Sequence, residues 1–415
     1  IVFGDWSSDV CSSDLTIPLM KRAGYPAEKA AAIEVAASTN GQLLPPVMGA
    51  AAFIIAERCG VPYLEVVRAA AVPAVISYLA LLFITHLEAV KLGLQPLPAD
   101  AVPRFWPEFR SGLHFLPPLG LLIWLLFRRY SPELAAFWSI LALTGMVAGR
   151  EIFEARRTGE GWDRALAGIG RFVMQSLVTG GRNMMGIGVA VAAAGIIVGI
   201  MTLGPGSLVT DVIGSVARGN LALILILAAV ASLLLGMGLP TTANYIVVST
   251  LAVPAILTLS AQQGVILVPL AVHLFCFFFG ILADDTPPVG LAAYAASAIA
   301  GSDPIRTGIQ GFRYDLRTAI LPFMFLFNTE LLLMNLGGPV HAAAVFACAL
   351  AAMFAFAAAT QGVLLRRNRA TETACLALAA AVLFRPGFFA ARSPPSSSSE
   401  GPPSALQSPN QHSSA

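Results

Sequence analysis

The feature that most restricts the fold is a break within an apolar segment, ADDTPPVGLAAYAA at residues 283–296. The run at 274–282 ahead of it is purely apolar, and two adjacent carboxylates and two adjacent prolines follow. Proline removes a backbone donor and disfavours helical geometry in the residue before it. We therefore expect helix on both sides of an unwound Asp285-Thr286, whose carbonyls are left free. A bilayer tolerates such backbone only where protein or water surrounds it, so the break predicts a binding site of a secondary transporter.

Composition supports a membrane location for this break. The chain has 415 residues, of which 57% are hydrophobic and 12% charged, whereas an ordinary soluble domain carries about 25% charged residues. We predict an all-α polytopic membrane protein with roughly ten membrane segments. The net charge of +2 does not favour a nucleic-acid partner. The five cysteines have no metal-ligand spacing, and no GxxxxGK[ST] or HExxH motif occurs, so we expect neither an ATPase nor an organic cofactor.

A second Pro-Pro break occurs in ASTNGQLLPPVMG at residues 37–49. From Pro46 to Pro62 is 62 − 46 = 16 residues, and from Pro288 to Pro304 is 304 − 288 = 16 residues. Matched interruptions of this kind are typical of transporters built from structural repeats. The alternative is chance recurrence in a chain with 28 prolines. The spacing leaves open whether the repeats are inverted.

These features divide the chain into six parts. We interpret residues 1–15 as a non-native leader and 16–100 as the remnant of the first repeat. Residues 101–180 hold connecting helices and a basic amphipathic linker, 181–338 the second repeat, and 339–390 the C-terminal helices. Residues 391–415 are expected to be a disordered tail, and whether it is native stays open. Within these parts we predict a loop at 95–110, an interfacial helix ending the basic segment 150–171, a separate span at 183–203, and a linker at 304–317 before a span at 318–336.

Polar side chains and unwound backbone at the breaks are the predicted ion- and substrate-binding groups. A sodium site needs several oxygen ligands in a dry pocket, and helix N-termini after the breaks favour an anion. The alternatives are helix-to-helix hydrogen bonding for the Thr and Asn residues, and a cap or headgroup position for the Asp pair. The Na+ candidates are Thr39, Thr242, Asp285 and Thr286. The full predicted set is Ser38, Thr39, Asn40, Gly41, Gln42, Pro45, Pro46, Gly236, Gly238, Pro240, Thr241, Thr242, Asn244, Asp284, Asp285, Thr286, Pro287 and Pro288.

Three stretches resemble one family of transporters: ASTNGQLLPPVMGAAAFI, GMGLPTTANYIVVSTLAVPAI and HLFCFFFGILADDTPPVGLAAYAASAIAG. They are similar to the large membrane subunit of tripartite ATP-independent periplasmic (TRAP) transporters, and more closely to the permeases that fuse small and large subunits. The resemblance covers residues 16–384, and its Gly/Ser-rich start and upstream helices are missing. TIPLMKRAGY with LPPVMG resembles the first helical hairpin, and TPPVG the tip of the second.

The resemblance implies a sodium-driven, elevator-type importer of organic anions such as dicarboxylates, and not an enzyme. It also implies a multi-pass protein of the bacterial inner membrane, fed by a periplasmic substrate-binding protein of the TAXI type. One alternative is a hairpin-type ion-coupled carboxylate carrier that works without a binding protein. A weaker one is an intramembrane aspartyl hydrolase using Asp284 and Asp285, for which the sequence offers no second aspartate motif.

Overall fold

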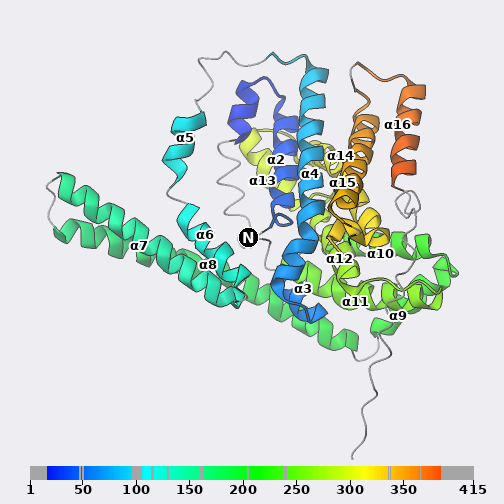
Figure 1. The fold of residues 1–415 in the computed structure, drawn as a ribbon, viewed down its shortest axis with the longest axis horizontal. Helices are drawn as coiled ribbons and strands as arrows, with labels where there is room; N and C mark the ends of the chain where they lie inside the picture. The colour runs from blue at the N-terminus through cyan, green and yellow to red at the C-terminus, as the bar shows by residue number, and fades with distance from the viewer. Residues whose placement is uncertain are drawn as a thin grey trace, which may run out of the picture.

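The computed structural model describes residues 16–45, 48, 51–95, 105–113, 116–128, 130–158, 162–202, 205–237, 241–334, 336, 338–364 and 366–384 (Figure 1). The predicted leader 1–15 and tail 391–415 lie outside them. The described chain is helical, and its one extended pairing is an isolated bridge between Val363 and Arg367. A helical segment at 16–22 precedes the labelled helices. These are α2 (Ala27–Gly41), α3 (Ala51–Cys59), α4 (Tyr63–Leu92), α5 (Phe105–Gly112), α6 (Leu116–Phe127), α7 (Pro132–Thr158), α8 (Trp162–Thr202), α9 (Pro205–Ala217), α10 (Leu221–Gly236), α11 (Thr241–Gln262), α12 (Pro269–Leu282), α13 (Leu291–Ala300), α14 (Pro304–Phe327), the 3-10 helix η2 (Thr329–Leu332), α15 (Pro339–Gln361) and α16 (Ala370–Leu383).

Several of these helices have the length and composition of membrane spans. Within the described residues, four are long and apolar enough to cross a bilayer: Tyr63–Leu92, Glu133–Arg157, Thr241–Gln262 and Pro339–Gln361. Shorter apolar helices, among them α6, α10, α12, α13 and α16, accompany them. The predicted fold class, an all-α polytopic membrane protein, is confirmed.

Two interrupted segments have the same local architecture. In the first, α2 ends at Gly41, a turn follows, and the short α3 leads through Gly60 into the long α4. In the second, α12 ends at Leu282, turns occupy residues 283–289, and the short α13 leads through Gly301 into α14. The two glycines have φ of +64° and +70°, a left-handed geometry that favours glycine. The predicted pair of matched breaks is confirmed in the residues that the structure describes.

The two segments run in opposite directions. The Lys21 ammonium ahead of α2 donates to the Ala300 carbonyl at the end of α13, at 2.7 Å. At the opposite end, Arg58 in the last turn of α3 lies near His273 in the second turn of α12. The start of each segment therefore lies beside the end of the other, and the breaks meet between them. The two interrupted segments are therefore antiparallel, a point that the sequence had left open.

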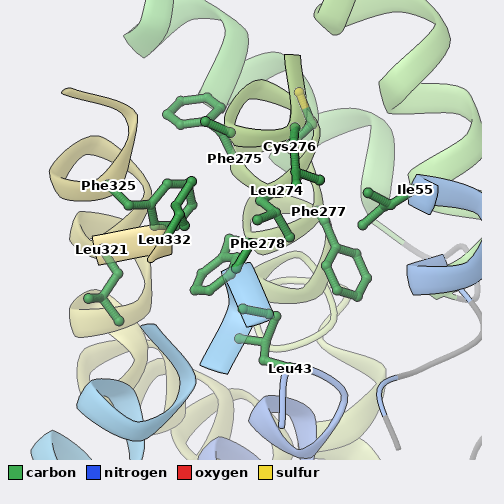
Figure 2. Close-up of a cluster of buried hydrophobic side chains, with 14 of the residues drawn as sticks. Leu43, Ile55, Leu274, Phe275, Cys276, Phe277, Phe278, Leu321, Phe325 and Leu332 are labelled. Atoms are coloured by element: carbon green, nitrogen blue, oxygen red, sulfur yellow. The ribbon is translucent and has the colours of Figure 1, made fainter. Parts of the chain in front are cut away.

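Helix α12 is the centre of the hydrophobic core. Every residue from Leu270 to Leu282 is buried, which is expected of a helix that is apolar on all sides. Figure 2 shows its side chains reaching Phe325 and Leu321 of α14 on one side and Ile55 of α3 on the other. The break at 283–290 thus directly follows a helix that is buried over almost its whole length.

At three predicted connections the structure has helix where the sequence predicted a loop, a linker or a separation between two helices. The predicted interfacial helix and the span 183–203 form one helix, α8, which packs along α7 as a long arm (Figure 1). The predicted loop 95–110 contains the start of α5, where Trp106 and Phe109 pack edge to face. The predicted linker 304–317 is the first half of α14, and four of its polar residues, Thr307, Tyr314, Asp315 and Arg317, are buried rather than in solvent.

The start of α14 depends on a side-chain cap. Asp303 Oδ1 accepts the Arg306 N–H at 2.8 Å, and Pro304 occupies the first helical position. Asp303→Ala should lower the free energy of unfolding in detergent by about 1 kcal/mol. Asp303→Asn retains an accepting oxygen and should lose much less. Equal losses for the two variants would contradict this role of the cap.

Candidate functional site

The first contact of the site joins the two breaks. Thr39, in the last turn of α2, places its Oγ1 2.8 Å from Asp285 Oδ2, although the residues are 246 positions apart. The same hydroxyl lies 2.7 Å from the Val35 carbonyl. Thr39 and Asp285 are 3% and 1% exposed. Two residues that the sequence placed in separate binding segments are therefore in direct, buried contact.

The neighbouring carboxylate, that of Asp284, contacts a different helix, α11. Thr241, the first residue of α11, donates its hydroxyl to Asp284 Oδ2 at 3.0 Å. Adjacent carboxylates in one break thus contact α2 through Asp285 and α11 through Asp284. The break at 283–290 thus connects α2 with α11.

Asn244 fits between two glycines. Its Nδ2 donates to the Gly280 carbonyl of α12 at 2.7 Å, and its side chain is fully buried. A Cβ on Gly236 would lie 2.3 Å from Nδ2, and one on Gly280 would lie 3.3 Å from it. These glycines let α10, α11 and α12 approach closely enough to enclose a polar side chain.

A polar network extends from α2 to α4 and α14. Asn40 Nδ2 donates to the Ala36 carbonyl at 2.7 Å and to Asp315 Oδ1 at 2.9 Å. Ser77 Oγ and Thr318 Oγ1 each lie 3.1 Å from Asn40 Oδ1. Both amide protons and the amide oxygen of Asn40 are therefore used, which fixes the orientation of this side chain.

Arg317 closes the network and is fully buried. Its guanidinium forms an ion pair with Asp315 Oδ1 at 3.1 Å. Nε donates to the Ser77 carbonyl at 3.0 Å, Nη2 to the Ala36 carbonyl at 3.3 Å, and Nη1 to the Tyr314 carbonyl. One side chain thus ties α2, α4 and α14 together.

Asp315 and Arg317 were missed by the sequence analysis, which placed them in a linker. A signal was present: Gly311, Asp315, Thr318, Pro322 and Phe325 recur at spacings of three and four, which makes one helical stripe with apolar members. The sequence offered no second aspartate motif to pair with Asp285, yet Asp315 lies nearby: Asp285 contacts Thr39, and Asp315 contacts the adjacent Asn40. Each of the two side chains is only 1% exposed.

The buried carboxyls are incompletely satisfied. Asp285 Oδ1 and Asp315 Oδ2 have no hydrogen-bond partner among the described residues. Ionised carboxylates accept and never donate, so they cannot satisfy each other. Among the described residues, no group of three or more His, Cys, Asp or Glu could hold a metal. The available groups are carboxylate, hydroxyl and carbonyl oxygens, which suit a hard cation rather than a transition metal.

A family profile described as "Tripartite ATP-independent periplasmic transporter, DctM component" matches residues 6–337. The chain belongs to the DctM family. Membership implies a membrane permease for a small solute that associates with a periplasmic binding protein. Residues 342–411 match a second profile, a domain of unknown function (DUF3394), which includes α15 from its fourth residue and α16. A comparison with curated proteins finds no match.

The other predicted residues of this DctM chain have more local roles. Ser38 Oγ donates to Glu34 at 3.2 Å, and Thr286 Oγ1 donates to the Leu282 carbonyl at 2.7 Å. The Thr286 carbonyl accepts the Gly290 N–H at 3.0 Å, so it is less free than predicted. Thr242 is buried in the first turn of α11. Gly41 and Gln42 end α2, Pro45, Pro287 and Pro288 lie in the turns, and Pro46, Gly238 and Pro240 fall outside the described residues.

Proposed function

We propose that the chain is the permease of a sodium-coupled, binding-protein-dependent importer of small organic anions, carboxylates in particular. The observation that carries this proposal is the buried contact between Thr39 and Asp285, where two antiparallel, interrupted helices meet. Substrate and coupling-ion sites of secondary transporters typically lie at such repeat interfaces. An elevator-type movement and a TAXI-type binding protein are parts of the same proposal and rest on the resemblance in sequence.

The cation is expected near the ends of α2 and α12. Both helices point their C-terminal ends, which carry partial negative charge, at the meeting point of the breaks. Of the four Na+ candidates, Thr39 and Asp285 are already in contact. Thr286 uses its proton on its own helix and keeps hydroxyl lone pairs for an ion. Thr242 is buried one residue after the Asp284 partner Thr241.

The anion is expected on the opposite side of each break. Helix α13 begins at Leu291, after the turns at residues 283–289, and α3 begins at Ala51. The first turn of a helix leaves N–H groups without intrahelical partners and carries partial positive charge. A substrate carboxylate close to these N–H groups would lie near the cation, which explains how transport of the two could be coupled.

Charge suggests the orientation of the protein. The end that holds the start of α2 and the end of α13 is rich in basic residues: Lys21, Arg22, Lys29, Lys91, Arg306, Arg366, Arg367 and Arg369. The end that holds α3 and the start of α12 has Arg58, Arg68 and Arg218. Basic loops favour the cytoplasmic side. We therefore place the first end in the cytoplasm of a bacterial inner membrane.

Labelling with a membrane-impermeant maleimide tests this orientation. With the other cysteines replaced by alanine, Cys59 should react in intact cells. Cysteine at Ser302, in the turn after α13, should react only after permeabilisation. The reverse pattern would contradict the assignment.

Uptake by proteoliposomes tests the function. We would reconstitute the full chain, add candidate soluble binding proteins loaded with radiolabelled small carboxylates, and compare inward Na+ and K+ gradients. Accumulation should require both the Na+ gradient and a binding protein. Accumulation without a binding protein would favour the independent carrier, and uptake driven equally by K+ would contradict sodium coupling.

A further inference from the structure

The turn between α15 and α16 concentrates positive charge. It covers residues 362–369 and contains Arg366, Arg367 and Arg369, all of which are exposed. From the start of the turn to Glu372 there is one acidic residue, so this stretch has a formal charge of 3 − 1 = +2. It belongs to the part of the chain that matches a domain of unknown function, and the site at the breaks does not use it.

The single carboxylate serves only one of the three guanidinium groups. Glu372 Oε1 accepts from Arg366 Nη2 at 2.8 Å. Its Oε2 accepts the backbone N–H of Arg369 at 2.7 Å, which caps the start of α16. Within the described part of the chain, no ion pair includes the guanidinium of Arg367 or Arg369. Two exposed cationic groups are therefore left for a ligand from outside the protein.

The turn is held so that these two side chains point outward. Asn368 folds back on α15: its Nδ2 donates to the Ala358 carbonyl at 3.1 Å, and its backbone N–H donates to the Gly362 carbonyl at 2.9 Å. The backbone is extended at Arg367, which forms the isolated bridge, and at Arg369, with φ −75° and ψ 160°. Successive side chains of extended backbone point to opposite sides. Because Asn368 points to α15, its two arginine neighbours point away from it.

The flanking helices place the turn at a membrane surface. Helix α15 is one of the four helices long and apolar enough to cross a bilayer, and the apolar α16 packs back along it (Figure 1). Leu364 in the turn and Leu378 and Val382 in α16 are exposed, as expected of side chains that face lipid. The arginines follow the end of a membrane span directly, so their guanidinium groups lie at the depth of lipid headgroups.

We propose that Arg367 and Arg369 bind the phosphate of an anionic phospholipid headgroup, in the leaflet at this end of the protein. The planar guanidinium fork matches phosphate oxygens in pairs. Basic residues next to a membrane span attract anionic lipids. The bound lipid would hold the α15–α16 hairpin at the surface, which gives this part of the domain of unknown function a role in lipid recognition. The proposal depends on neither the coupling ion nor the substrate.

Lipid-dependent stability tests the proposal. We would follow thermal unfolding of the purified full chain in neutral detergent as the mole fraction of phosphatidylglycerol rises, and repeat the series with phosphatidylcholine. Phosphatidylglycerol should raise the melting temperature more. Arg367→Gln combined with Arg369→Gln should raise the mole fraction for half-maximal stabilisation by about 25-fold, since each basic residue near an anionic surface contributes a factor of about 5.

Two further variants separate a local site from a general effect of charge. Arg22→Gln combined with Arg306→Gln removes the same charge from exposed residues at the same end of the protein, and should leave the phosphatidylglycerol response unchanged. Arg367→Lys combined with Arg369→Lys keeps the charge without the planar fork, so its response should be intermediate. Because the Glu372 cap accepts a backbone N–H, it survives in all four substitutions of the turn.

Three outcomes would overturn the proposal. Equal stabilisation by phosphatidylglycerol and phosphatidylcholine would leave the two guanidinium groups to an acidic protein partner. An unchanged response in the double glutamine variant, or an equal loss in the Arg22 and Arg306 control, would rule out this turn as the site. Stabilisation by inorganic phosphate as strong as that by phosphatidylglycerol would assign the turn to a soluble anion.

Discussion

Replacing Gly236 with alanine should destabilise the protein and abolish its transport. The added Cβ would lie 2.3 Å from Asn244 Nδ2 and 2.7 Å from the Ala283 Cβ. Asn244 cannot retreat, because its Nδ2 is bonded to Gly280 and the Gly280 backbone lies behind it. We expect a loss of about 3 kcal/mol, combining overpacking with a broken buried hydrogen bond. Unfolding in detergent and uptake in proteoliposomes measure the two effects.

Gly180 of α8 provides the control for this substitution. A Cβ there would meet no atom within 4 Å, so Gly180→Ala should be neutral or gain up to about 1 kcal/mol from helix propensity. Adding Asn244→Ala to Gly236→Ala should restore part of the stability by removing the clashing amide, without restoring transport. If Gly236→Ala and Gly180→Ala behaved alike, the close packing around Asn244 would be refuted.

Removing the charge of Arg317 should be the most damaging change in the polar network. Arg317→Met leaves Asp315 buried without its ion-pair partner and removes donors to the Ala36, Ser77 and Tyr314 carbonyls. Breaking a buried pair in this way costs about 3–5 kcal/mol. The free energy of unfolding measures the loss.

Two further variants identify the cause of the stability loss in Arg317→Met. Arg317→Lys keeps the charge but cannot reach three carbonyls with one point-like ammonium group, so its loss should be intermediate. In Arg317→Met combined with Asp315→Asn, the uncompensated charge disappears, and the double variant should be more stable than Arg317→Met alone. A double variant that loses the sum of both single effects would show that the two groups do not interact.

The sequence predicts the breaks because their causes are local. Pro-Pro pairs, small residues and left-handed glycines act within a few positions, so the interruptions after α2 and α12 follow from residues that lie next to them. The equal 16-residue spacing also follows from counting. The direction of the repeats does not, because it depends on contacts such as Lys21 with Ala300, between residues 279 positions apart.

The polar residues that contact the site are harder to predict, because polar residues are normally expected to be exposed to solvent. Residues 304–317 resemble a solvated connector in composition, yet Thr307, Tyr314, Asp315 and Arg317 are buried against α2 and α4. A charged residue is stable there only with partners from distant helices, and the chain gives no local sign of them. The same holds for Asp284 and Asp285, whose different partners, Thr241 and Thr39, depend on tertiary packing.

The two interrupted helices share one site at Thr39 and Asp285, and a double-mutant cycle can test this shared site. Thr39→Val, Asp285→Asn and the double variant would be compared with wild type for the free energy of unfolding at saturating Na+. We expect a coupling energy of about 0.5–3 kcal/mol, as for residues in contact within one network. If the stability loss of the double variant equals the sum of the two single losses to within about 0.3–0.5 kcal/mol, the residues act independently. That result would contradict a shared site.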